Sequence, residues 1–374
     1  MDTLSKFFTK SVWGKSLIVL VLWNLTIRVL GVIGYFLLPS RFAPLDFISP
    51  LFQSNFLIWA FANFDGEHYL SIAKYGYQFR GGFPQYAFFP LLPVLVKLVS
   101  FIIRDYYVSG MIITQAAMWI ALVYLTRWVK LLGLKDIRPL LLFTTGSIFL
   151  ASIYTEPVFL ALAALTLYFS EKKWWGSAII STALATATRV NGVFLAAFLL
   201  VKMYKSGMKP AVILRNFIVS FAGLFSYMVF LYFKTGDALA WFHSQGAWGK
   251  ATATSPLTTA LSYFKAITYE FQPDFVHVVV VIEVATTIFA IYLFYALLRA
   301  KLLDLSYWVY LGGNLAMPIM TGSLGSMPRF FLILFPLLVV VPKLPPFTKT
   351  MYYIFSVTTF VIGVIFFLRG YWYA

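Results

Sequence analysis

The chain has 374 residues, of which 61% are hydrophobic and only 11% are charged. Soluble domains are usually about half apolar and about a quarter charged, so this composition excludes an ordinary soluble protein. One or two soluble domains of this length would leave far more apolar surface than their cores could bury. The sequence therefore predicts an integral membrane protein in which residues 1–374 form a single domain.

The net charge of +16 does not indicate a nucleic-acid-binding protein, because the basic residues recur between apolar runs instead of forming one patch. The chain has no cysteine, which excludes disulfides and thiolate chemistry. Its three histidines show no HExxH or other paired spacing, so we expect no structural zinc site. The predicted partner of the chain is the lipid bilayer, not nucleic acid.

Long continuous apolar runs predict membrane-spanning helices, since a helix needs about 20 apolar residues to cross the bilayer and satisfies its backbone internally. The expected fold is therefore an all-α transmembrane bundle. The first run follows three lysines and is too long for a signal peptide, so we interpret it as a signal anchor. In chain order the clear runs lie near 17–38, 108–130, 212–233, 276–298, 303–320 and 350–368.

The remaining apolar segments are less regular. Residues 139–205 are cut by short polar pieces, which predicts two tight hairpins, and 330–342 is a short run. Segment 86–103 contains two prolines and an internal lysine, and we interpret it as interfacial or re-entrant. With a cytoplasmic N-terminus this choice places most Lys and Arg clusters inside the cell, as the positive-inside rule requires. It predicts about eleven spans, an external C-terminus and two long external loops, 39–107 and 234–275.

Three ionisable residues of the first external loop are candidate site residues: Asp65 for catalysis, and Glu67 and His68 for substrate binding. In a helix, Asp65 and His68 share a face at i,i+3, whereas Glu67 points elsewhere. Acidic residues close to the membrane surface are desolvated, which favours a functional role. The alternative is that Asp65 caps the start of a helix. A divalent cation held by all three residues is also open, although we favour no cofactor and no metal.

Further polar residues fall at hairpin tips and helix starts on the same external face. Tyr154 and Glu156 belong to one such turn, Arg189 and Asn191 to the next, and Arg329 begins a later span. An arginine in this position either extends toward the lipid headgroups or binds a phosphate through paired hydrogen bonds. Two arginines and an acidic loop on one face favour an anionic lipid ligand.

The second external loop contains a cluster of residues that suit sugar binding. His243, Gln245 and Trp248 lie within the sequence WFHSQGAWGK. An aromatic ring can stack on a pyranose and an amide can bind its hydroxyls. The same residues equally suit an amphipathic helix at the membrane interface, with an aromatic belt.

Four patches together resemble a known family. FDGEHYLSIAKYGY with AFFPLLP, then SIFLASIYTEPVFLALA, then ATATRVNG, and finally PRFFLILFPL are similar to the glycosylphosphatidylinositol mannosyltransferase II family and its prokaryotic relatives. That family belongs to the C-type glycosyltransferases, multi-spanning enzymes that use polyprenyl-phosphate sugars. The resemblance extends from about residue 60 to 340, and it implies that Asp65 is the catalytic carboxylate of the first external loop.

The resemblance implies an inverting transfer of mannose from a polyprenyl-phosphate donor to a glycolipid or glycan acceptor. Asp65 would take the acceptor proton, and Arg189 or Arg329 would stabilise the leaving phosphate. The expected location is the plasma membrane of a prokaryote or the endoplasmic reticulum of a eukaryote, with an extracytoplasmic active site. The alternatives are a secondary transporter or lipid flippase, and a non-catalytic glycolipid-binding subunit.

Overall fold

The computed structural model describes residues 11–42, 53–80, 82–250, 253–272 and 274–373. Nearly all of the described chain is helical, as the apolar runs predicted. The described strands, β1 (Phe79–Arg80) and β2 (Phe83–Pro84), form one small antiparallel hairpin.

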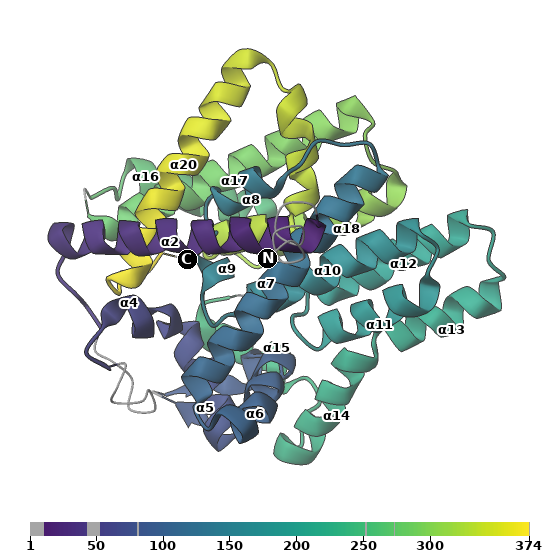
Figure 1. Ribbon diagram of the computed structural model, residues 1–374, viewed down its shortest axis with the longest axis horizontal. Coiled ribbons are helices and arrows are strands. Elements are labelled where there is room, and N and C mark those ends of the chain that lie inside the picture. Colours follow the sequence, from purple (N-terminus) through teal and green to yellow (C-terminus); the bar gives the residue numbers. More distant parts are fainter. Residues whose placement is uncertain (1–10, 43–52, 81, 251–252, 273, 374) are drawn as a thin grey trace, which may run out of the picture.

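Four helices are long and apolar enough to cross a membrane: α2 (Val12–Leu37), α7 (Tyr106–Leu131), α17 (Phe275–Ala300) and α20 (Pro346–Leu368). In Figure 1, α2 lies across the front of the bundle, and α17 and α20 lie together above it. All four coincide with predicted runs. The membrane-protein assignment is therefore confirmed, but the count of about eleven spans is not.

The predicted span at 212–233 is broken into α13 (Pro210–Ser220) and α14 (Ala222–Thr235), which bend by 48° and would add a fifth span if counted together. Gly223, in the first turn of α14, lies directly against helix α11 (Trp175–Thr186). A Cβ atom at this position would be 2.1 Å from the carbonyl oxygen of Ala183. The glycine therefore permits a backbone contact that any other residue would block.

The other helices are shorter than a membrane span. Segment 86–103 contributes a 13-residue helix, α6, which at 1.5 Å per residue is about 20 Å long and does not reach across the hydrocarbon core. These shorter elements are α4 (Phe56–Trp59), η1 (Ala60–Ala62), α5 (Asp65–Tyr75), η2 (Gln85–Ala87), α6 (Leu91–Ile103), α8 (Arg138–Leu142), α9 (Ile148–Ala151), α10 (Thr155–Glu171), α12 (Gly192–Lys205), α15 (Ala240–His243), η3 (Ser244–Trp248), α16 (Pro256–Thr268), α18 (Leu305–Met320), α19 (Met327–Ile333) and η4 (Phe335–Lys343).

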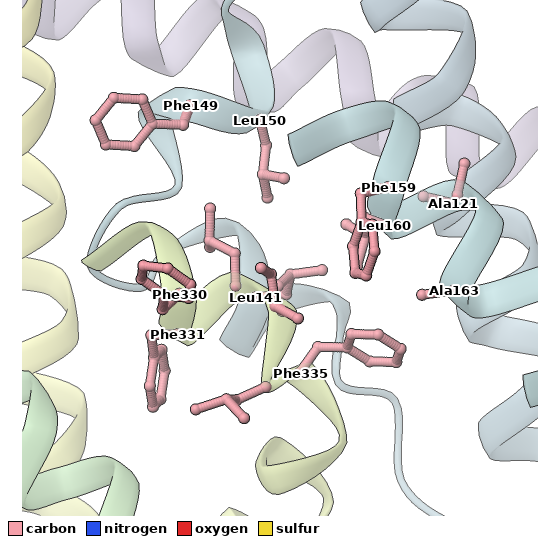
Figure 2. Packing of buried hydrophobic residues seen from close by; sticks show 14 of the residues in the cluster. Ala121, Leu141, Phe149, Leu150, Phe159, Leu160, Ala163, Phe330, Phe331 and Phe335 are labelled. Carbon is pink, nitrogen blue, oxygen red and sulfur yellow. The ribbon is translucent and has the colours of Figure 1, made fainter. Parts of the chain in front are cut away.

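Helix α10 forms the centre of the core and is buried along almost its whole length. Its small residues, such as Ala163, let neighbouring helices approach closely. Figure 2 shows Phe159 and Leu160 of α10 in one apolar cluster with Phe330 and Phe331 of α19. This packing fixes the first turn of α10 beside α19.

A polar cluster joins α10 to α12 and α18 at the end of α10 that lies away from α19. The ammonium of Lys202, near the end of α12, contacts Glu171 at 2.6 Å and Asp304 at 2.9 Å. Glu171 ends α10, and Asp304 caps the start of α18. Tyr307 of α18 also donates to Glu171, at 2.6 Å. The end of α10, the end of α12 and the start of α18 therefore meet at Lys202. The other ends of these three helices lie on the opposite side of the bundle.

Candidate functional site

Asp65 lies at the start of α5, immediately after a strained turn. Phe64 precedes it with φ 58°, a backbone region that costs a bulky residue on the order of 1–3 kcal/mol. Tyr154 holds the turn in place: its hydroxyl donates to the Asn63 carbonyl at 2.9 Å and accepts from the Asp65 amide at 3.1 Å. Asn63 itself donates to the Phe367 carbonyl at 2.8 Å. Such strain, supported from several sides, is typical of functional sites.

The Asp65 carboxylate faces an arginine. Arg329 Nη1 donates to Asp65 Oδ2 at 2.6 Å, and both side chains are largely buried. The residue at the helix N-cap is Phe64, and no side chain makes the capping bond. The capping alternative for Asp65 is therefore wrong. Among the described residues, no hydrogen bond reaches Asp65 Oδ1.

Glu156 joins the two arginines predicted from the sequence. Arg329 Nε donates to Glu156 Oε1 at 2.6 Å, and Arg189 Nη1 contacts the same oxygen. The Glu156 side chain is only 1% exposed, and its Oε2 has no hydrogen-bond partner among the described residues. A buried carboxylate of this kind is stable only when it is paired with a cation, and here two guanidinium groups share it. Glu156 thus fixes the spacing of both arginines.

A cavity of about 300 Å³ opens beside this charge cluster. Its volume is at the lower end of the range typical for ligand sites. Most of its wall is apolar and aromatic, and the polar groups are concentrated near Asp65. The lining residues are Asp65, Tyr69, Ala87, Phe88, Phe89, Thr155, Thr188, Arg189, Val190, Asn191, Trp241, Phe242, Gln245, Trp248, Lys250, Met317, Thr321, Ser326, Arg329, Phe330 and Trp372.

Six of the predicted site residues line this cavity, and two more lie directly behind its wall. Asn191 uses its amide to hold the α11–α12 turn against α18, donating to Asn314 Oδ1 at 2.8 Å. Tyr154 and Glu156 lie behind the wall, where they position Asp65 and the arginines. The six lining residues are Asp65, Arg189, Asn191, Gln245, Trp248 and Arg329.

Glu67 and His68 line a second, more open hollow with Arg80 and Phe83. Glu67 is paired with Arg80 at 2.7 Å. The His68 ring stacks on Phe88 at 4.9 Å between centroids, and burial lowers the pKa of His68. The two residues therefore point to a surface next to the main cavity, separate from the Asp65–Arg329 pair.

His243 lies away from both hollows. Its Nδ1 pairs with Asp237 Oδ2 at 2.7 Å, and 59% of its side chain is exposed. Gln245 and Trp248, in contrast, belong to the cavity wall, with Trp248 donating its indole N–H to the Pro84 carbonyl at 3.1 Å. The three residues were predicted to form one cluster, but only Gln245 and Trp248 line the cavity.

Lys250 is the cavity residue that sequence reasoning missed. It ends the stretch WFHSQGAWGK, and its ammonium lies 5.0 Å from the centre of the Phe330 ring. Burial, and then the charges of Arg329 and Arg189, lower the pKa of Lys250 to about 8. A lone lysine within a run of aromatic residues was the available signal.

The three residues considered as possible metal ligands do not converge. Arg329 engages Asp65, Arg80 engages Glu67, and His68 lies beside Gln85 at 3.3 Å. Within the described ranges no group of three or more His, Cys, Asp or Glu side chains is placed to hold a metal ion.

Comparison with known proteins identifies the family of the chain. The human and rat proteins named GPI alpha-1,6-mannosyltransferase 2 are 25% and 26% identical to the chain over 179 and 180 residues. These matches cover 43% of this chain but only 35% of the relatives' length. The family model described as Mannosyltransferase (PIG-V) matches residues 15–235, which include Asp65, Glu156 and Arg189. The chain belongs to this mannosyltransferase family.

Proposed function

We propose that the protein is a membrane mannosyltransferase that moves mannose from polyprenyl-phosphate mannose to a hydroxyl group of a glycolipid or glycan. The family supports the sugar, and the two relatives' names support a lipid-linked acceptor. The observation that carries the proposal is the arrangement around Asp65. A carboxylate with a free oxygen faces a mostly apolar cavity whose other charged groups are cations.

Asp65 acts as the general base. The acceptor oxygen attacks the anomeric carbon of mannose, its proton passes to Asp65 Oδ1, and the bond from that carbon to the phosphate oxygen breaks. The products are the mannosylated acceptor, with inverted configuration, and polyprenyl phosphate. Arg329 holds Oδ2 at 2.6 Å and so orients the carboxylate before the acceptor arrives.

The leaving group needs positive charge. The phosphodiester of the donor carries one negative charge, and polyprenyl phosphate gains a second as the bond breaks. Cations already fixed in a largely dehydrated wall can stabilise this developing charge without rearranging. We propose that the cation cluster beside Asp65 supplies this stabilisation and that transfer needs no added metal.

The site lies at the external end of the bundle in this proposal. Helices α10, α12 and α18 reach it with their Thr155, Gly192 and Met317 ends, and their opposite ends meet at Lys202. Lysines and arginines follow at that opposite end, as expected for a cytoplasmic face. The full count of about eleven spans would include the short helices of 139–205.

The decisive experiment is mannose transfer from polyprenyl-phosphate mannose by the purified protein in lipid. Asp65→Asn keeps the shape of the side chain but removes the base, and we expect turnover to fall by at least about 10²-fold with donor binding retained. Asp237→Asn, at an exposed aspartate outside the cavity, is the matched control and should transfer normally. Normal turnover by Asp65→Asn would remove this residue as the base. Substrate translocation without any transfer would instead support a transporter.

A further inference from the structure

We propose that Lys250 binds the phosphate group of the polyprenyl donor, and that Arg189 and Arg329 mainly position the carboxylates. This inference rests on the proposed function for the identity of the donor. It assigns to Lys250 a role that the sequence had suggested for the two arginines.

The charge balance of the site supports this assignment. Arg329 is bonded to both Asp65 and Glu156, and Arg189 contacts Glu156 as well. Two carboxylates thus neutralise two guanidinium groups. Lys250 makes no ion pair with the described residues, so the group formed by Asp65, Glu156, Arg189, Arg329 and Lys250 has one surplus positive charge. Glu283 is a further carboxylate near Lys250, and it accepts from the Ser326 amide at 3.3 Å. That surplus matches the single charge of a sugar phosphodiester.

The position of Lys250 suits a phosphate at the edge of an apolar site. Its ammonium and the Arg189 guanidinium both approach the Phe330 ring, at 5.0 and 5.8 Å from its centre. Phe330 directly follows Arg329 in α19, so the same helix supplies both the ring and the second guanidinium group. On the other side of Lys250, α15 and η3 supply Trp241, Phe242 and Trp248 to the cavity wall. A phosphate at Lys250 would therefore share the cavity with aromatic side chains that an isoprenoid chain can contact.

An ammonium whose pKa is about 8 is also easier to desolvate than an ordinary lysine, and an incoming anion restores the charged form. The position is not part of the family match, which ends at residue 235. Lys250 and Arg329 both come from the part of the chain beyond that match.

The test measures binding of a phosphate probe without requiring turnover. Farnesyl phosphate and the neutral alcohol farnesol are titrated against wild type, Lys250→Gln and Lys250→Arg in lipid nanodiscs. Losing a charge-assisted contact typically weakens binding about 10- to 100-fold, so we expect Lys250→Gln to lose this much affinity for farnesyl phosphate. Affinity for farnesol should not change, which also shows that the variant is folded, and Lys250→Arg should retain most of the phosphate binding.

The control is Lys265→Gln, because Lys265 is exposed and paired with Glu270 at 2.7 Å. It should bind both probes like the wild type. Equal farnesyl phosphate affinity for wild type and Lys250→Gln would overturn the inference. Different results would contradict the role of Lys250 and the proposed reaction. If the wild type transfers mannose and Lys250→Gln has an unchanged donor KM, the role of Lys250 is wrong and the proposed reaction stands. If phosphate binding depends on Lys250 but no mannose is transferred, the proposed reaction is wrong and the role of Lys250 stands.

Discussion

Glu156 is the residue on which the geometry of the site depends most. It is deeply buried and lies between two arginines that come from different parts of the chain. Without its charge, both guanidinium groups would remain in the protein interior with less compensation. Asp65 would then be the remaining carboxylate within reach, and Arg329 would be free to leave its present orientation.

We therefore expect Glu156→Gln to lower the free energy of unfolding by about 3–5 kcal/mol, the usual cost of breaking a buried ion pair. Thermal unfolding in detergent measures the effect. Glu270→Gln, which removes an exposed partner of Lys265, is the control and should change stability by less than about 0.5 kcal/mol. Equal melting temperatures for Glu156→Gln and wild type would show that the arginines do not need this carboxylate.

Single residues of the site were predictable only where a short pattern carried the signal. Asp65, Arg189 and Arg329 stand out because charged groups are rare in an apolar chain. Their pairing was not predictable, because it depends on how α19 packs against the first turns of α5 and α10, which lie far away in the sequence. Lys250 was missed for the same reason: its surplus charge becomes visible only after the other charges are paired.

At the scale of elements, the long apolar helices were predicted well and the short ones poorly. Runs above about 20 residues are set by the bilayer thickness, and α2, α7, α17 and α20 follow it. The shorter helices are instead determined by packing against each other. The break between α13 and α14 shows this, since the hydrophobic pattern through Phe221 is continuous and the bend lies next to the close contact of Gly223 with α11.

A methyl group at Gly223 tests this contact. Gly223→Ala places a Cβ 2.1 Å from the Ala183 carbonyl oxygen, which belongs to the backbone of a packed helix. We expect a loss of about 1–3 kcal/mol in stability, typical of overpacking, and a lower melting temperature. Gly176→Ala in α11 is the matched control, because no atom lies within 4 Å of its Cβ. Alanine favours the helix there, so this variant should melt at the wild-type temperature or slightly higher. If both substitutions behaved alike, the close packing at Gly223 would not contribute to stability.

At the scale of the whole molecule, the bundle has two chemically different ends. One end holds the cavity with Asp65 and its paired arginines, and the other holds the cluster around Lys202. Helix α10 separates them by about 25 Å, from its 17 residues at 1.5 Å each. This separation is somewhat less than the roughly 30 Å hydrocarbon thickness of a membrane. We propose that the two ends face opposite aqueous sides.

The absence of cysteine from the sequence makes this arrangement directly testable. Single cysteines are introduced at two exposed lysines, Lys172 beyond the end of α10 and Lys265 in α16. In sealed cells or right-side-out vesicles, a membrane-impermeant maleimide should label Lys265→Cys before permeabilisation and Lys172→Cys only afterwards. The unsubstituted chain provides a background of zero thiols. Labelling of both positions from the outside would contradict the opposed ends, and the reverse order would place Asp65 and its donor site on the cytoplasmic face. For the polyprenyl-phosphate donor that we propose, the same result decides which leaflet must supply it, because such a donor reacts on the face where its phosphate is accessible.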